Sequence, residues 1–269
     1  MRIDLALVER GLARSRNHAS SLVESDRVLV NGKAARKSSQ NVDDTDKISV
    51  LDAVDYVSRA GHKLAKALDV FTEIDLVGTT ALDVGASTGG FTDVLLRRGV
   101  AKVFAIDVGH EQMVEQLFEH PKVICVEGFN ARELSPETLS ERTGIQQSLI
   151  NIDVVVADLS FISLTLVLRQ MLSVAPEADF VLLVKPQFEV GKQSLSAHGL
   201  VNDHNLRAGA IKQVVAEAES LGLGIRGLER SELPGTHGNV EYVLWISPKE
   251  RPNQSKWTDR IESVAKESK

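Results

Sequence analysis

The sequence predicts an α/β protein with a doubly wound, mostly parallel sheet of about seven strands, preceded by a small α+β domain. Three observations lead to this prediction. From about residue 58 onward, short apolar runs rich in β-branched residues alternate with segments of helical spacing. A glycine-rich turn follows the first of these runs. The first 50 residues differ, because they read as two short helices followed by a hairpin.

The N-terminal segment, residues 1–51, is predicted to form a compact basic domain. We expect helices over residues 4–9 and 15–25, with Ser15 as the N-cap of the second helix. The Asn31-Gly32 pair supplies the positive φ angles of a tight hairpin turn. Although the net charge of the chain is −6, residues 10–37 contain seven basic and two acidic side chains. This local excess of positive charge favours a phosphate backbone as the binding partner.

A short polar linker at residues 52–57 leads into a larger domain that we expect over residues 58–247. This domain opens with a helix, since Leu64, Ala67 and Leu68 recur at helical spacing. The strands are predicted at the runs ALDV, VFAIDV, VICVE, IDVVVADLS, DFVLLV and VEYVLWIS, and the helices near residues 92–98, 111–119, 163–173 and 205–221. Residues 248–269 are polar, so we expect a loosely held C-terminal tail.

Composition excludes several classes of protein. No apolar run approaches the roughly 20 residues that a membrane-spanning helix needs. Charged residues interrupt the N-terminus where a signal peptide would be apolar, so we expect a cytoplasmic protein. Cys125 is the single cysteine, which excludes an internal disulfide or a thiolate zinc cluster, and the seven histidines show no metal-ligand spacing. We therefore expect no metal.

The turn GASTGG at residues 85–90 follows the predicted strand ALDV and leads into a helix. It lacks the Gly-Lys-Ser/Thr of a P-loop, and Ser87 stands where a dinucleotide-binding GxGxxG motif needs glycine. Asp83 precedes the turn, and Asp107 ends the next strand, where a carboxylate can bind both ribose hydroxyls. This pattern fits a site for adenosine and an amino-acid group, while another nucleotide or a degenerate site stays open.

Residues 58–247 resemble class I, Rossmann-like S-adenosylmethionine methyltransferases, specifically the FtsJ-like branch that modifies ribose 2′-oxygen. The resemblance implies that Gly85 and neighbouring amides contact the methionine portion, Asp107 the ribose, and Asn130 with Ala131 the adenine edge. The complete implied donor site is Asp83, Gly85, Ala86, Ser87, Thr88, Gly89, Gly90, Phe91, Asp107, Val108, Asn130, Ala131 and Asp158.

Four charged residues stand at the expected ends of elements: Lys63 in SRAGHKL, Asp158 in ADLSF, Lys185 in VKPQFE and Glu241 in GNVEY. Methylating an alcohol requires alignment of the acceptor and removal of its proton. A lysine can accept this proton only when uncharged, a form that burial and nearby positive charge favour and carboxylates oppose. By resemblance to the Lys-Asp-Lys-Glu tetrad of ribose methyltransferases, Lys185 is the base, Asp158 and Glu241 orient it, and Lys63 aligns the hydroxyl. Ordinary ion-paired roles are the alternative.

Residues 2–50 resemble the S4 RNA-binding domain, whose helix pair and following loop grip the backbone of structured RNA. A Ser25-Asp26 pair replaces the usual glycine before the first strand. The implied RNA-contacting residues are Arg2, Arg10, Arg14, Ser15, Arg16, Lys33, Arg36 and Lys37.

The order of all these motifs resembles the TlyA, or haemolysin A, family over nearly the whole chain. Many relatives read SRGAHKL where this chain has SRAGHKL, an exchange that leaves Lys63 in register and puts the start of its helix in question. The resemblance implies an enzyme that uses S-adenosylmethionine to methylate the 2′-hydroxyl of a cytidine in ribosomal RNA, within one or both ribosomal subunits. It also implies an effect on sensitivity to capreomycin-type antibiotics.

Two other functions compete with this interpretation. The family's older name suggests a membrane-active haemolysin, which would need an apolar or amphipathic segment. A methyltransferase fold could also serve as a non-enzymatic RNA-binding or ribosome-assembly factor. The sequence leaves the modified nucleotide and the oligomeric state open.

Overall fold

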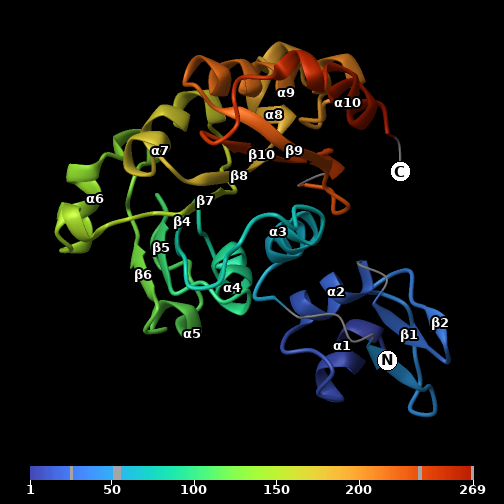
Figure 1. The fold of residues 1–269 in the computed structure, drawn as a ribbon. Helices are drawn as coiled ribbons and strands as arrows, with labels where there is room; N and C mark the ends of the chain where they lie inside the picture. The colour runs from blue at the N-terminus through green and yellow to red at the C-terminus, as the bar shows by residue number, and fades with distance from the viewer. Residues whose placement is uncertain (25–26, 51–55, 236–237, 268–269) are drawn as a thin grey trace. The chain divides into compact units, whose positions relative to one another are not determined.

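The computed structural model describes residues 1–24, 27–50, 56–235 and 238–267. The chain forms two compact units, Met1–Asp55 and Tyr56–Lys269 (Figure 1). The Ser25-Asp26 pair and most of the expected linker lie outside the described residues.

The N-terminal unit contains two helices and a three-stranded antiparallel sheet of order β2-β1-β3. Asn31 (φ 50°) and Gly32 (φ 79°) both adopt left-handed conformations in the β1–β2 turn, as the Asn-Gly pair predicted. Ser15 Oγ accepts a hydrogen bond from the His18 amide at 3.2 Å, which is the expected capping contact. The elements are α1 (Ile3–Glu9), α2 (Arg16–Glu24), β1 (Val28–Val30), β2 (Lys33–Ala34) and β3 (Ile48–Val50).

The larger unit is built on a seven-stranded sheet of order β6-β5-β4-β7-β8-β10-β9. All neighbouring strands pair in parallel except β10, which runs antiparallel to both β8 and β9. The chain moves outward from β4 in both directions, so β4 and β7 meet at the switch point where such sheets bind ligands. The strands are β4 (Thr80–Val84), β5 (Lys102–Ile106), β6 (Val123–Val126), β7 (Val154–Ala157), β8 (Asp179–Val184), β9 (Gly224–Arg230) and β10 (Tyr242–Ser247).

Helices cover both faces of this sheet (Figure 1). Alternate strand residues serve opposite faces: Ala81 packs in the core shared with α3 and α4, whereas Leu82 and Val84 pack in the core shared with α7 and α9. The helices are α3 (Arg59–Val70), α4 (Gly90–Arg97), α5 (Glu115–Phe118), α6 (Pro136–Thr143), α7 (Leu168–Val174), α8 (Pro186–Glu189), α9 (His204–Ser220) and α10 (Gln254–Lys266), with short 3-10 turns η1 (Ala131–Glu133), η2 (Gln147–Leu149), η3 (Leu164–Leu166) and η4 (Lys192–Ser194).

The C-terminal segment differs from our expectation. Residues 248–269 were expected to be loosely held, but they contain α10, which packs on the sheet side shared with α9. Ile261, Val264 and Ala265 are fully buried, and Arg207 of α9 donates to the Ala265 carbonyl at 2.8 Å. A narrow apolar stripe at i, i+3 and i+4 is enough to dock an otherwise polar helix.

Two further differences concern the start of the larger unit and the strand β9. The larger unit starts at Tyr56, before the expected residue 58, because Tyr56 is buried and the Val57 amide donates to Asp93 on α4 at 3.0 Å. The sequence did not locate β9, since the run GIRGLER lacks regular alternation. Pairing along the whole of β10 makes it a strand.

Candidate active site

The glycine-rich turn lies at the carboxyl end of β4, between β5 and β7. Gly85 (φ 84°), Ser87 (φ 46°) and Gly89 (φ 95°) adopt left-handed conformations that reverse the chain into α4. A Cβ on Gly85 would lie 3.0 Å from the Asp158 carbonyl oxygen, and one on Gly90 would overlap Ser58 Oγ. Glycine is therefore required by close packing against two neighbouring segments.

A pocket opens above this turn. Seven of the residues predicted to bind the donor line it, and four residues without a donor-binding prediction also contribute. The predicted lining residues are Gly85, Ala86, Ser87, Thr88, Gly90, Phe91 and Asp158, and the others are Ser58, Ala60, Ser160 and Lys185. The turn, the start of α3 and the ends of β7 and β8 therefore enclose one space.

Asp83 lies beneath this turn and is completely buried. Thr92 Oγ1 donates to its Oδ2 at 2.7 Å, whereas Oδ1 has no hydrogen-bond partner among the described residues. Burial raises the pKa of Asp83 to about 7, against the opposing effect of the Thr92 hydrogen bond. A buried acceptor with an unused oxygen is suited to a cationic donor from a ligand.

Asp107 directly follows β5 and connects two loops near the pocket. Its carboxylate accepts from the Ser87 amide at 2.8 Å and from the Gly109 amide at 2.7 Å, so it joins the glycine turn to the loop after β5. The Phe129 amide donates to the Asp107 carbonyl at 2.8 Å, and Asn130 then caps η1 by accepting from the Arg132 amide at 3.1 Å.

The remaining predicted donor residues lie around these contacts. Ala131 is buried behind Asn130, Val108 is 70% exposed beside Asp107, and Gly89 lies at the start of α4. The expected ribose and adenine residues therefore share one edge of the sheet.

Lys185 and Asp158 form the first of two buried ion pairs. Lys185 Nζ lies 2.6 Å from Asp158 Oδ1 and donates to Ser160 Oγ at 2.9 Å. Both charged side chains are at most 15% exposed. They come from the ends of adjacent parallel strands, where Ala157 of β7 pairs with Leu182 of β8.

Lys63 and Glu241 form the second pair, with Nζ and Oε2 2.5 Å apart and side chains 9% and 2% exposed. Gln187 also donates to Glu241 Oε1 at 3.4 Å. The expectation that Glu241 orients Lys185 is therefore not met by the contacts of the described residues. The reason is tertiary: α3 packs along β10, with the ring of Phe71 at its end 5.6 Å from that of Trp245, so Lys63 near its start lies beside the start of β10.

Sequence reasoning missed several polar and aromatic residues of the site. Ser160 and Gln187 contact the tetrad directly, and both occur within the quoted motifs ADLSF and VKPQFE. Phe161 is 91% exposed with φ 65°, and its ring lies 5.1 Å from that of Phe188. Their position just after the ends of β7 and β8 is the signal by which the sequence could have identified them. The orientation of these side chains depends on the folded conformation of the segments after β7 and β8.

The basic residues predicted to contact RNA are exposed on the N-terminal unit. Arg2 and Arg16 flank Asp4 at 3.0 and 3.2 Å, and the Arg2 hydrogen bonds hold the pKa of Asp4 below its usual value. Arg10 donates to the carbonyls of Asp46 and Asp43 at 2.6 and 2.8 Å. These three arginines thus also stabilise the unit. The other predicted residues are Arg14, Ser15, Lys33, Arg36 and Lys37.

The sheet order, the glycine turn at the switch point and the carboxylates after β4 and β5 define the class: a Rossmann-like methyltransferase fold joined to a small RNA-binding type of domain. Residues 56–247 match the FtsJ-like methyltransferase family, and residues 1–48 match the S4 domain. The chain belongs to the TlyA family of FtsJ-like methyltransferases.

Individual relatives agree with this assignment. The chain is 46% identical to the 16S/23S rRNA (cytidine-2′-O)-methyltransferase TlyA of Mycobacterium tuberculosis, over 91% of this chain and 89% of the relative. It is 35% identical to Hemolysin A of Brachyspira hyodysenteriae, over 90% and 98% of the two chains. A solved structure from Streptococcus thermophilus, described as a candidate hemolysin, matches with a TM-score of 0.73 and 32% identity, over 98% and 94% of the chains.

No helix in the described part of the chain is long and apolar enough to cross a membrane. Within those same residues, no group of three or more His, Cys, Asp or Glu side chains is arranged to hold a metal ion.

Proposed function

We propose that this protein transfers a methyl group from S-adenosylmethionine to the 2′-hydroxyl of a cytidine in ribosomal RNA, and that it does so in the cytoplasm. The observation that carries the proposal is the buried Lys185–Asp158 contact in the lining of the glycine-turn pocket, which a second buried pair, Lys63–Glu241, accompanies. The related enzymes of M. tuberculosis and Campylobacter jejuni are named as cytidine-2′-O-methyltransferases of rRNA, which supports the choice of substrate.

The residues around the pocket fit S-adenosylmethionine. The unpaired Oδ1 of Asp83 would accept from the ammonium of its methionine portion. The amides of Gly85, Ala86, Ser87 and Gly89 donate within the protein, so the start of α4 would face the carboxylate of the methionine portion. Asp107 would take the ribose hydroxyls, with Asn130 and Ala131 near the adenine edge. When bound, this donor supplies an electrophilic methyl group on a sulfonium.

In this proposal, Lys185 takes the proton from the ribose hydroxyl. The buried Lys185 Nζ contacts Asp158 Oδ1 and donates to Ser160 Oγ, and these two contacts fix the direction of the amine. Lys63, held by Glu241, presents a second cation at the same edge and positions the acceptor. General-base catalysis and alignment are the two contributions that these residues make.

RNA would be held in two ways. The basic side chains of the S4 unit bind phosphates of a folded RNA, which gives affinity without reading the sequence. Phe161, an exposed aromatic residue that directly follows Ser160, offers a stacking surface for an unstacked nucleotide. An exposed phenylalanine with positive φ is costly for folding, which favours a binding role.

The decisive experiment maps methylation on ribosomal subunits treated with the full-length protein and labelled S-adenosylmethionine. We expect 2′-O-methylcytidine after nuclease digestion, and its absence with Lys185→Ala. Lys256→Ala, which changes an exposed lysine on α10, serves as the matched control and retains activity. A base-methylated nucleoside would contradict the assignment of Lys185.

The same variants separate the two rival functions. Absence of label on subunits and on naked RNA would favour a non-enzymatic RNA-binding role. Leakage of liposomes caused equally by the wild-type protein and Lys185→Ala, without S-adenosylmethionine, would favour a haemolysin.

A further inference from the structure

Glu189 is a buried carboxylate at the end of α8, four residues after Lys185. Its Oε1 accepts from the Leu164 amide at 3.0 Å, and its Oε2 accepts from Ser163 Oγ. Neither partner is a cation, and burial raises the pKa of Glu189 against these two hydrogen bonds. A buried carboxylate without a cationic partner costs free energy, so its presence calls for an explanation.

The two partners of Glu189, Ser163 and Leu164, lie at the end of the segment that carries Asp158 and Ser160. This segment, residues 158–163, leaves β7 and leads into η3, whose first residue is Leu164. At its start it is held by the pairing of β7 with β8, and at its end it is held by Glu189. The carboxylate therefore ties the loop after β7 directly to the helix that follows Lys185.

The segment between these two attachments is strained. Phe161 has φ 65°, a conformation that a bulky residue keeps only where its surroundings hold it. If the attachment at residues 163–164 were lost, the segment could relax, and Ser160 Oγ and Asp158 Oδ1 would move relative to Lys185 Nζ. These two contacts, at 2.9 and 2.6 Å, depend on how the segment after β7 lies relative to Lys185 at the end of β8.

We propose that Glu189 is a positioning residue that sets the geometry of Lys185 by clamping the loop after β7 to α8. The inference rests on the proposed function, because it assigns Glu189 a role in the reaction of Lys185. The clamp needs hydrogen-bond acceptors of the right length and not a negative charge, since both donors are neutral.

The two substitutions Glu189→Gln and Glu189→Met separate geometry from packing. In Glu189→Gln, Oε1 can accept from Leu164 while the amide nitrogen donates to Ser163 Oγ, whose hydroxyl can rotate. In Glu189→Met, the chain length is similar, but the Leu164 amide loses its acceptor, and Thr165 Oγ1, at 2.7 Å, is the acceptor left to the Ser163 hydroxyl.

Full-length variants are assayed for methylation of ribosomal subunits. We expect Glu189→Met to lower kcat about 10- to 100-fold, the scale of a misplacement near 1 Å, with unchanged KM for subunits and unchanged Kd for S-adenosylmethionine. Glu189→Gln stays within about twofold of wild type. Wild-type kcat in Glu189→Met, an equal loss in both variants, or a loss that only follows the folded fraction overturns the proposal.

A second measurement judges the clamp without using activity. Acetic anhydride labels lysines, and mass spectrometry gives the labelling rate of Lys185 relative to the exposed Lys256 in the same molecule. We expect Lys185 to react several times faster in Glu189→Met than in wild type, and at the wild-type rate in Glu189→Gln. Equal rates in all three proteins overturn the clamp, whereas a wild-type protein that leaves subunits unmethylated while the rates differ overturns only the proposed function.

Discussion

Breaking the ion pair between Lys63 and Glu241 should destabilise the larger unit far more than breaking an exposed pair. The side chains are 9% and 2% exposed, so Glu241→Gln leaves a buried ammonium without its counter-charge. Such a loss costs about 3–5 kcal/mol, whereas replacing both partners of a buried pair is close to neutral. We therefore expect Lys63→Met/Glu241→Gln to be more stable than Glu241→Gln alone.

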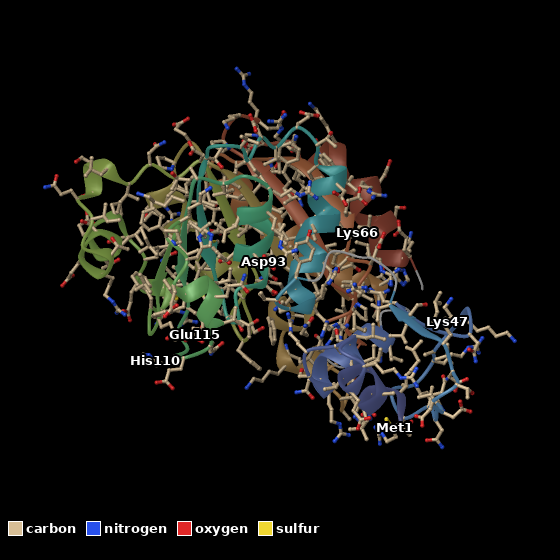
Figure 2. The ribbon with its side chains drawn as sticks, turned by 90° about the horizontal axis from the view of Figure 1, so that it is seen from below. Met1, Lys47, Lys66, Asp93, His110 and Glu115 are labelled. Carbon is tan, nitrogen blue, oxygen red and sulfur yellow. The ribbon has the colours of Figure 1, made fainter. Side chains whose placement is uncertain are left out.

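The chain provides a matched control for this prediction. Lys66 lies one turn further along α3 and is labelled in Figure 2. It pairs with Glu232 at 3.7 Å, with side chains 61% and 71% exposed. Glu232→Gln should cost less than about 1 kcal/mol, since exposed pairs contribute little.

Urea unfolding followed by tryptophan fluorescence measures these differences on the relevant unit. The chain has two tryptophans, Trp245 and Trp257, and both belong to Tyr56–Lys269. A loss for Glu241→Gln no larger than that for Glu232→Gln would refute the reasoning. Strict additivity of the Lys63 and Glu241 substitutions would refute it equally, because coupled partners give a non-additive cycle.

Three further predictions concern the donor pocket and the RNA-binding unit. Gly90→Ala should abolish binding of S-adenosylmethionine in calorimetry, because the added Cβ overlaps Ser58 Oγ, whereas Gly209→Ala on α9 meets nothing within 4 Å and should bind normally. Asp83, whose pKa burial raises to about 7, should lose its proton when the cationic donor binds, since a nearby positive charge favours the carboxylate. The affinity for S-adenosylmethionine should therefore rise as the pH rises through 7. Calorimetry in buffers of different ionisation enthalpy would measure the protons released on binding. Release of the same number of protons by Asp83→Asn would contradict this prediction. Lys33→Gln should weaken binding of ribosomal RNA and make the slope of log K against log salt concentration about one unit shallower. An unchanged slope would exclude a phosphate contact by Lys33.

Much of the fold follows from local patterns. The run ALDV with the turn GASTGG predicted β4, the pocket and the required glycines, because a short apolar strand and left-handed backbone are local properties. The Asn31-Gly32 turn was predicted for the same reason. In contrast, β9 and α10 depend on partners distant in sequence. Local patterns therefore contain no clear signal for β9 and only a narrow apolar stripe for α10.

The sequence by itself indicated seven of the residues that line the glycine-turn pocket, since strand ends and glycine spacing are read along the chain. Only the tertiary structure decided how the four charged residues combine. Lys185 pairs with Asp158 because their strands are neighbours, and Lys63 pairs with Glu241 because α3 packs along β10. The clamp by Glu189 was equally invisible, because its two partners lie 25 and 26 residues earlier and meet it only in the folded protein.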